Sequence, residues 1–231
     1  MHMTDLLAPF AAGWGRRVRT ELDVVPHPFD AARQFVGGPD PDRVLVLGNG
    51  PAIGFGVLAQ ELALPGHLAR RLALLTGRGA SVDVAARRGT TAATAPALLA
   101  DVRVAQYDAV VVCIGSSDAY DLLPAERWRS DLGQLVDALR AASSPTTVIA
   151  VLGIRPLQRP NAALGRAGAL VDGHARRLDA LARDVCGRRD GVVHIAVDAL
   201  LTEAPTGSTG YEALATGIAQ VLAQHLSLIH I

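Results

Sequence analysis

The sequence predicts a three-layer α/β/α domain built around a five-stranded, mainly parallel sheet. Its 231 residues lie within the range that one domain fills. Short β-branched runs alternate with segments of helical period, which is typical of βαβ units. The runs are continuously apolar, as expected of strands covered on both faces. Together these observations favour a doubly wound sheet with a site at the carboxyl ends of its strands.

Each element follows from a local pattern in chain order. Five apolar runs bounded by Gly or polar residues predict the strands: 43–48, 81–86, 109–115, 146–153 and 191–197. Five segments with apolar residues at helical spacing predict the helices between and after them: 65–77, 91–102, 124–142, 170–185 and 209–226. In the third helix, the apolar stripe that begins at Trp128 is expected to be core.

The two ends of the chain are interpreted separately from the domain at 43–225. Residues 1–42 combine an amphipathic segment with Pro- and Gly-rich turns, and we expect them to form an arm packed on the domain. The last six residues, LSLIHI (226–231), resemble the translation of a sequencing adapter. We interpret them as an artefact and exclude His230 from the candidate catalytic residues.

Composition narrows the class of protein. The 22 basic residues balance the 22 acidic ones, so no overall field favours nucleic acid or an anionic membrane surface, and neither is expected as a partner. No apolar run is long enough to cross a bilayer, and the N-terminus lacks the pattern of a secretory signal, so a cytoplasmic location is expected. Cys113 and Cys186 are too few for a disulfide framework, and Cys113 is expected to be a buried thiol.

A Gly-rich turn, GNGPAIGFG (48–56), follows the first predicted strand. One interpretation is a nucleotide site, in which backbone N–H groups hold a pyrophosphate. That site requires G-x-G-x-x-G leading directly into a helix, and an acidic residue after the second strand. Here the spacing is G-x-G-x-x-x-G, the next helix begins only near Pro65, and the second strand ends without an acid. Nucleotide binding is therefore an alternative and not the leading hypothesis.

Four motifs in order carry a second interpretation. VLVLGNGPAIGFGV (44–57), the glycine of AARRGTT (85–91), IGSSDAYDL (114–122) and GSTGYEALA (207–215) each resemble a conserved block of the SGNH, or GDSL-type, hydrolases. The resemblance spans about residues 40–225. It implies a flavodoxin-like α/β fold and an ancestry among esterases and lipases.

The resemblance places family positions on individual residues at the first three blocks. The nucleophilic serine of the family corresponds to Gly50, which has no side chain to attack an ester, and the aspartate before it corresponds to Asn49. The oxyanion glycine is kept as Gly89. The asparagine that shares this role corresponds to Ser117, next to a retained Asp118.

The last block places the remaining two members of the triad. The histidine position falls at Pro205 and its aspartate partner at Thr202. No histidine lies between His194 and His225, so no alignment of this loop supplies a general base. Since losing one triad member typically costs about 10⁴ to 10⁶ in rate, ordinary ester hydrolysis is not expected.

The sequence therefore predicts a degenerate member of this family that binds a small molecule or a partner protein. The predicted pocket is lined by Asn49, Gly50, Gly89, Ser117 and Asp118. An active ester or acyl hydrolase with a nonstandard nucleophile is the main alternative, and Ser116, Ser117 and Ser208 lie on loops that the fold would bring to the pocket. No cluster of His or Cys completes a metal set, so neither a metal nor another cofactor is expected.

Overall fold

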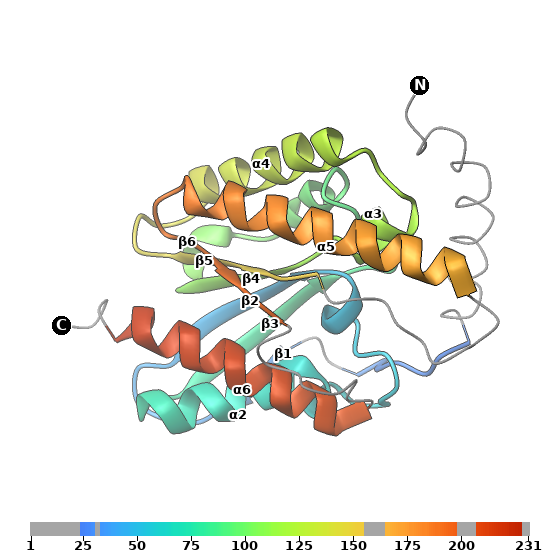
Figure 1. Cartoon of the computed structure of the whole chain (residues 1–231). Helices are drawn as coiled ribbons and strands as arrows, with labels where there is room; N and C mark the ends of the chain where they lie inside the picture. Colours follow the sequence, from blue (N-terminus) through green and yellow to red (C-terminus); the bar gives the residue numbers. More distant parts are fainter. Residues whose placement is uncertain (1–23, 31–32, 155–164, 198–206, 228–231) are drawn as a thin grey trace.

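The computed structural model describes residues 24–30, 33–154, 165–197 and 207–227 of the chain. These residues form three layers, with a central sheet between two pairs of helices (Figure 1). The three-layer α/β class predicted from the sequence is confirmed.

The sheet has six strands in the order β1-β3-β2-β4-β5-β6. Strands β2 to β6 run parallel to one another, and β1 pairs antiparallel with β3 at one edge. The strands are β1 (Arg33–Val36), β2 (Asp42–Gly48), β3 (Ala80–Ala86), β4 (Ala109–Cys113), β5 (Val148–Leu152) and β6 (Val192–Ile195). All five predicted strands are present, and β1 adds a sixth from the segment predicted as an arm.

Helices cover both faces of the sheet. On one face lie α2 (Leu64–Thr76) and α6 (Gly207–Leu226), which pack against each other, and on the other lie α4 (Ala125–Ala142) and α5 (Gly165–Gly187) (Figure 1). Central strands are buried on both sides, so alternate residues of β2 enter opposite halves of the core. This double cover explains why the strands are continuous apolar runs in the sequence.

The α4–α5 half of the core is centred on one aromatic residue. Trp128 is fully buried, and its indole Nε1–H donates to the carbonyl of Leu178 on α5 at 3.1 Å. Leu132, Leu135 and Leu139 continue the same buried stripe along α4. The prediction that this stripe is core is confirmed.

One of the five predicted helices, at residues 91–102, is not an α-helix in the structure. Residues 91–102 were expected to be helical, but only a short 3₁₀ helix, η3 (Ala95–Leu99), forms there. Pro96 lies in its first turn, and the hydroxyl of Thr94 accepts the Thr91 N–H at 3.0 Å. Such local side-chain bonds compete with helical backbone bonds, which explains why the predicted α-helix is wrong here.

Neither cysteine pairs. Cys113 and Cys186 are both free and buried, as expected for Cys113, and burial raises the pKa of the Cys113 thiol to about 12 and that of Cys186 to about 11. Within the residues that the structure describes, no helix combines the length and apolar character needed to traverse a bilayer.

Candidate functional site

The turn after β2 lies at the carboxyl edge of the sheet, where the sequence places the site. Gly48 has a φ of +124°, and a Cβ there would lie 2.2 Å from the carbonyl oxygen of Cys113 on β4. Only glycine permits this approach of β2 to β4. The Asn49 N–H then donates to the same carbonyl at 2.7 Å, so the turn is fixed to the next strand.

The turn after β4 brings the third motif to the same place. Gly115 precedes a short helix, α3 (Ser116–Tyr120), whose first residues face the β2 turn. The Asn49 amide Nδ2–H donates to the hydroxyl oxygen of Ser117 at 2.7 Å, and both side chains are buried. The two predicted pocket residues are therefore in direct contact.

Ser116 lies beside Gly50, the residue that the sequence analysis aligned with the family's nucleophile. Gly50 has a φ of +57°, and a Cβ built on it would lie 3.4 Å from the Ser116 hydroxyl oxygen. A hydroxyl group is thus present beside Gly50. It comes from the turn after β4, whereas Gly50 itself lies in the turn after β2. Ser116 is half-buried, so this hydroxyl retains access to solvent.

Asp118 connects α3 to the loop that follows β3. Its carboxylate Oδ1 accepts the Ala92 N–H at 3.4 Å, and its Oδ2 is buried without a hydrogen-bond partner among the described residues. The side chain is 1% exposed. Burial raises the pKa of Asp118 to about 7, so near neutral pH much of this residue is an uncharged acid that can donate a hydrogen bond.

Gly89 stands in the exposed loop between β3 and Ala92. Its φ is +72°, and its neighbour Thr90 is buried, with its hydroxyl donating to the carbonyl of Arg87 at 2.7 Å. The contact of Ala92 with Asp118 places this loop beside α3. The two remaining family positions, Thr202 and Pro205, lie outside the described residues.

No described histidine hydrogen-bonds a serine of α3. His194 donates from Nε2 to the carboxylate of Asp179 at 2.9 Å and has a side chain only 6% exposed, so it is a hydrogen-bonded core residue. Burial would raise the pKa of Asp179, but the bonds from His194 and from the Ile154 N–H outweigh it and lower that pKa. His174 on α5 is half-buried, and its Nε2 donates to the Leu123 carbonyl at 2.8 Å.

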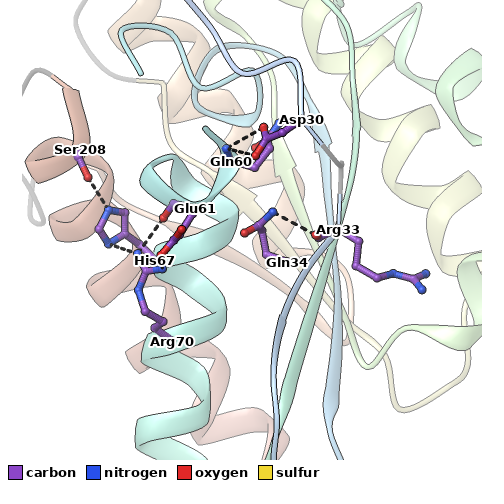
Figure 2. Close-up of polar contacts among 8 residues, drawn as sticks. All are labelled: Asp30, Arg33, Gln34, Gln60, Glu61, His67, Arg70 and Ser208. Atoms are coloured by element: carbon purple, nitrogen blue, oxygen red, sulfur yellow. Dashed lines mark hydrogen bonds and ion pairs between the residues drawn. The ribbon is translucent and has the colours of Figure 1, made fainter. Parts of the chain in front are cut away.

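The structure reveals one serine–histidine contact that the sequence did not predict. His67 Nε2 on α2 lies 2.8 Å from the hydroxyl of Ser208 at the start of α6 (Figure 2). Arg70 donates to His67 Nδ1 at 3.1 Å, so in the neutral ring the proton is on Nε2, which donates to Ser208. Burial and then the charge of Arg70 lower the pKa of His67.

These electrostatics oppose a catalytic role for the pair. A general base must accept the serine proton at the nitrogen that faces it, and a third group should stabilise the resulting cation. In this pair the facing nitrogen already carries a proton, and the third group, Arg70, is itself a cation. We therefore interpret His67 and Ser208 as a structural link between α2 and α6.

The described residues at the carboxyl edge of the sheet do not resemble a metal site or a nucleotide site. Among residues 24–30, 33–154, 165–197 and 207–227, no three His, Cys, Asp or Glu side chains converge as metal ligands would. The Gly-rich turn continues into a 3₁₀ helix, η1 (Gly50–Ala52), and not directly into an α-helix. The strand order β3-β2-β4-β5-β6 also differs from the usual order of dinucleotide-binding sheets and matches the flavodoxin-like one.

Comparison with protein families gives one match. The model described as the GDSL-like lipase/acylhydrolase family matches residues 46–221, which include the turn at Asn49 and Gly50, the loop at Gly89 and helix α3. No curated protein sequence matches the chain.

Comparison with solved structures gives the same fold. A carbohydrate acetylesterase family member from Sinorhizobium meliloti aligns with a TM-score of 0.65 at 22% identity, covering 80% of this chain and 99% of that chain. A lipase/acylhydrolase from Enterococcus faecalis aligns with a TM-score of 0.62 at 17% identity, covering 79% and 96%. A lipase from a goat rumen metagenome aligns with a TM-score of 0.65 at 13% identity, covering 78% and 97%.

Proposed function

Because the chain belongs to the GDSL-like lipase/acylhydrolase family, we propose that it is a member that binds a carboxylate or ester ligand without ordinary ester hydrolysis. The observation that carries this proposal is Gly50, which stands at the nucleophile position without a side chain. No described histidine hydrogen-bonds the serines beside Gly50. The site therefore lacks both a serine hydroxyl at the position of the nucleophile and a histidine to accept its proton.

The site can still bind a ligand after losing a catalytic side chain, because backbone N–H groups form part of it. The N–H groups of Gly50 and Gly89 remain where the family holds an oxyanion, and replacing a serine by glycine removes only the side chain. The neutral form of Asp118 adds a buried donor near the same loop. Similar structures described as a carbohydrate acetylesterase and a lipase/acylhydrolase support a carboxylate or ester as the ligand class.

One observation favours a second candidate function, an acyl hydrolase that uses Ser116. Its hydroxyl oxygen lies 3.4 Å from the point that a Gly50 Cβ would occupy, which is close to the place of the family's nucleophile. This candidate lacks a base, since no described histidine contacts Ser116 and the chain has no histidine between His194 and His225.

A fluorophosphonate probe for activated serines, combined with turnover of p-nitrophenyl acetate, tests the proposal. We expect neither labelling nor turnover from the folded protein. The Ser116→Ala variant is the matched control, because it removes the one hydroxyl that the described residues place within 4 Å of a Gly50 Cβ and leaves the backbone donors in place. Labelling and turnover that disappear in this variant would replace the proposed function with the second candidate.

We also propose a cytoplasmic location. The two free, buried cysteines support it, since unpaired thiols are common where the compartment is reducing. Fractionation of cells producing the protein tests this: recovery outside the cytoplasm would contradict it.

A further inference from the structure

A cleft opens at the carboxyl end of β3, beside the candidate site. Its volume is about 400 Å³, within the range of small-molecule pockets. Three apolar residues of its lining are half-buried, so each keeps surface that a ligand can reach: Ile53 from the turn after β2, and Val84 and Ala86 from the end of β3. Since apolar surface is stabilised when it leaves water, these residues favour the apolar part of a ligand.

One wall of the cleft comes from the segment before β1, which is fixed on the turn after β2. The Gly56 N–H donates to the carbonyl of Pro26 at 2.7 Å. The Gln60 N–H donates to the carboxylate of Asp30 at 2.9 Å (Figure 2). The wall is therefore held by the protein's own hydrogen bonds, and a ligand that enters the cleft need not order it.

Arg87 brings a positive charge to the same cleft. Its side chain is exposed, and its guanidinium makes no hydrogen bond or ion pair with the part of the chain that the structure describes. Its backbone is fixed, because its N–H donates to the Gly48 carbonyl at 3.0 Å and its carbonyl accepts the Thr90 N–H at 3.2 Å. Arg88 is already engaged, and its guanidinium carbon lies 5.3 Å from the Phe55 ring centroid.

The charge of Arg87 selects the kind of ligand. None of the described residues that line the cleft is acidic, so nothing in the lining neutralises this guanidinium. A guanidinium binds a carboxylate through two parallel N–H···O bonds, whereas a neutral ester offers it no charge. An apolar surface beside one such cation fits a molecule with a hydrocarbon chain and a single carboxylate.

We propose that this cleft binds a free monocarboxylic acid as its anion, with the carboxylate at Arg87 and the hydrocarbon chain on Ile53, Val84 and Ala86. The inference rests on the proposed function for the ligand class, and it narrows carboxylate or ester to the carboxylate alone. It also adds an arginine side chain to the backbone N–H groups as a group that holds the ligand.

Isothermal titration with a series of straight-chain acids tests the ligand class. Acetate, butyrate, hexanoate and octanoate differ only in chain length, and methyl hexanoate is the neutral counterpart of hexanoate. We expect hexanoate to bind at least tenfold more tightly than acetate, because each fully buried methylene contributes about fourfold in affinity. We expect methyl hexanoate to bind at least threefold more weakly than hexanoate, a modest factor because Arg87 is exposed.

Two variants locate the binding, and each has a matched control. Arg87→Gln should abolish the preference for hexanoate over methyl hexanoate, and Arg103→Gln, at an exposed arginine before β4, should not. Ile53→Ser should reduce the gain in affinity with chain length. Leu74→Ser, at an exposed leucine of α2, should leave that gain unchanged. Ile53 belongs to neither half of the core, and circular dichroism checks that each variant is folded.

The outcomes separate this inference from the proposed function. Methyl hexanoate bound as tightly as hexanoate, or a preference for hexanoate that persists in Arg87→Gln, would overturn the inference. The proposed function, which admits an ester as ligand, would still stand. Turnover of methyl hexanoate together with hexanoate binding that depends on Arg87 would overturn the proposed function and support the inference. Absence of binding by both compounds would contradict both.

Discussion

Asp118 is a buried carboxylic acid whose two oxygens have unequal surroundings. Oδ1 accepts a backbone N–H, whereas Oδ2 has no partner in the described structure, so the ionised form is poorly solvated. At the scale of single residues, this is the clearest electrostatic cost in the site, and it makes folding depend on pH.

The Asp118→Asn variant tests this cost. Burial raises the pKa from 3.8 to about 7 in the folded protein, so the folded state holds a proton that the unfolded chain releases. The stability from this group is full below about pH 4 and is lost as pH rises toward 7. Because asparagine imitates the neutral acid, we expect the variant to gain on the order of 2–4 kcal/mol at pH 8 and little at pH 4.

Urea unfolding at both pH values, followed by circular dichroism, measures this difference. An equal effect of the substitution at pH 4 and pH 8 would show that Asp118 is ionised in the folded protein throughout this range.

Gly50→Ser is the second prediction at this scale. A serine at this position should not give ester hydrolysis, because no described histidine hydrogen-bonds the neighbouring serines of α3 and the sequence has no histidine between His194 and His225. The φ of +57° also disfavours a side chain, so we expect a loss of about 1–2 kcal/mol in stability. Turnover of p-nitrophenyl acetate and urea unfolding of this variant are the measurements, and turnover well above the parent protein would reveal a base that we have not identified.

The sequence predicted some of these residue contacts and not others. Asn49 and Ser117 could be placed together because their motifs follow adjacent parallel strands, whose carboxyl ends share one edge. The contact of His67 with Ser208 joins residues 141 positions apart on two helices, and no spacing in the sequence indicates it. The sequence predicts Ser116 only as a loop serine near the pocket, because its approach to Gly50 depends on backbone geometry that composition does not reveal.

At the scale of elements, Trp128 connects α4 to α5 through its burial and its bond to Leu178. Trp128→Ala removes the largest fully buried side chain described and should destabilise the protein by about 3–5 kcal/mol. Trp128→Phe keeps most of the apolar volume and should cost less. Urea unfolding of both variants checks the order, and equal losses would show that the indole volume contributes little.

The helices and strands with strong apolar periodicity were predicted correctly. Prediction failed where local polar contacts determine the structure or where the element is short. The five parallel strands and four of the predicted helices are confirmed with boundaries shifted by a few residues. Strand β1 has only four residues and is partly exposed, so its sequence, RQFV, carries little signal. Helix α3 has five residues, too few for a periodic pattern.

At the scale of the whole molecule, the balance of 22 basic and 22 acidic residues gives an isoelectric point of about 7.1. Proteins with little net charge repel one another weakly. Exposed apolar side chains such as Phe29, Leu58 and Phe35 add attraction. We expect light scattering in low salt to be strongest near pH 7 and to fall at pH 9, and scattering independent of pH would contradict this explanation.

The packing of α2 against α6 also has a consequence for synthesis. Arg71 and Glu212, which form an ion pair between these helices, lie 141 positions apart. During synthesis on the ribosome, α2 therefore emerges long before α6 is translated. Until then, Leu64, Leu68 and Leu72 lack the α6 side chains that help to bury them in the folded protein. Until the final helix is translated, the nascent chain presents an apolar surface of the kind that chaperones bind.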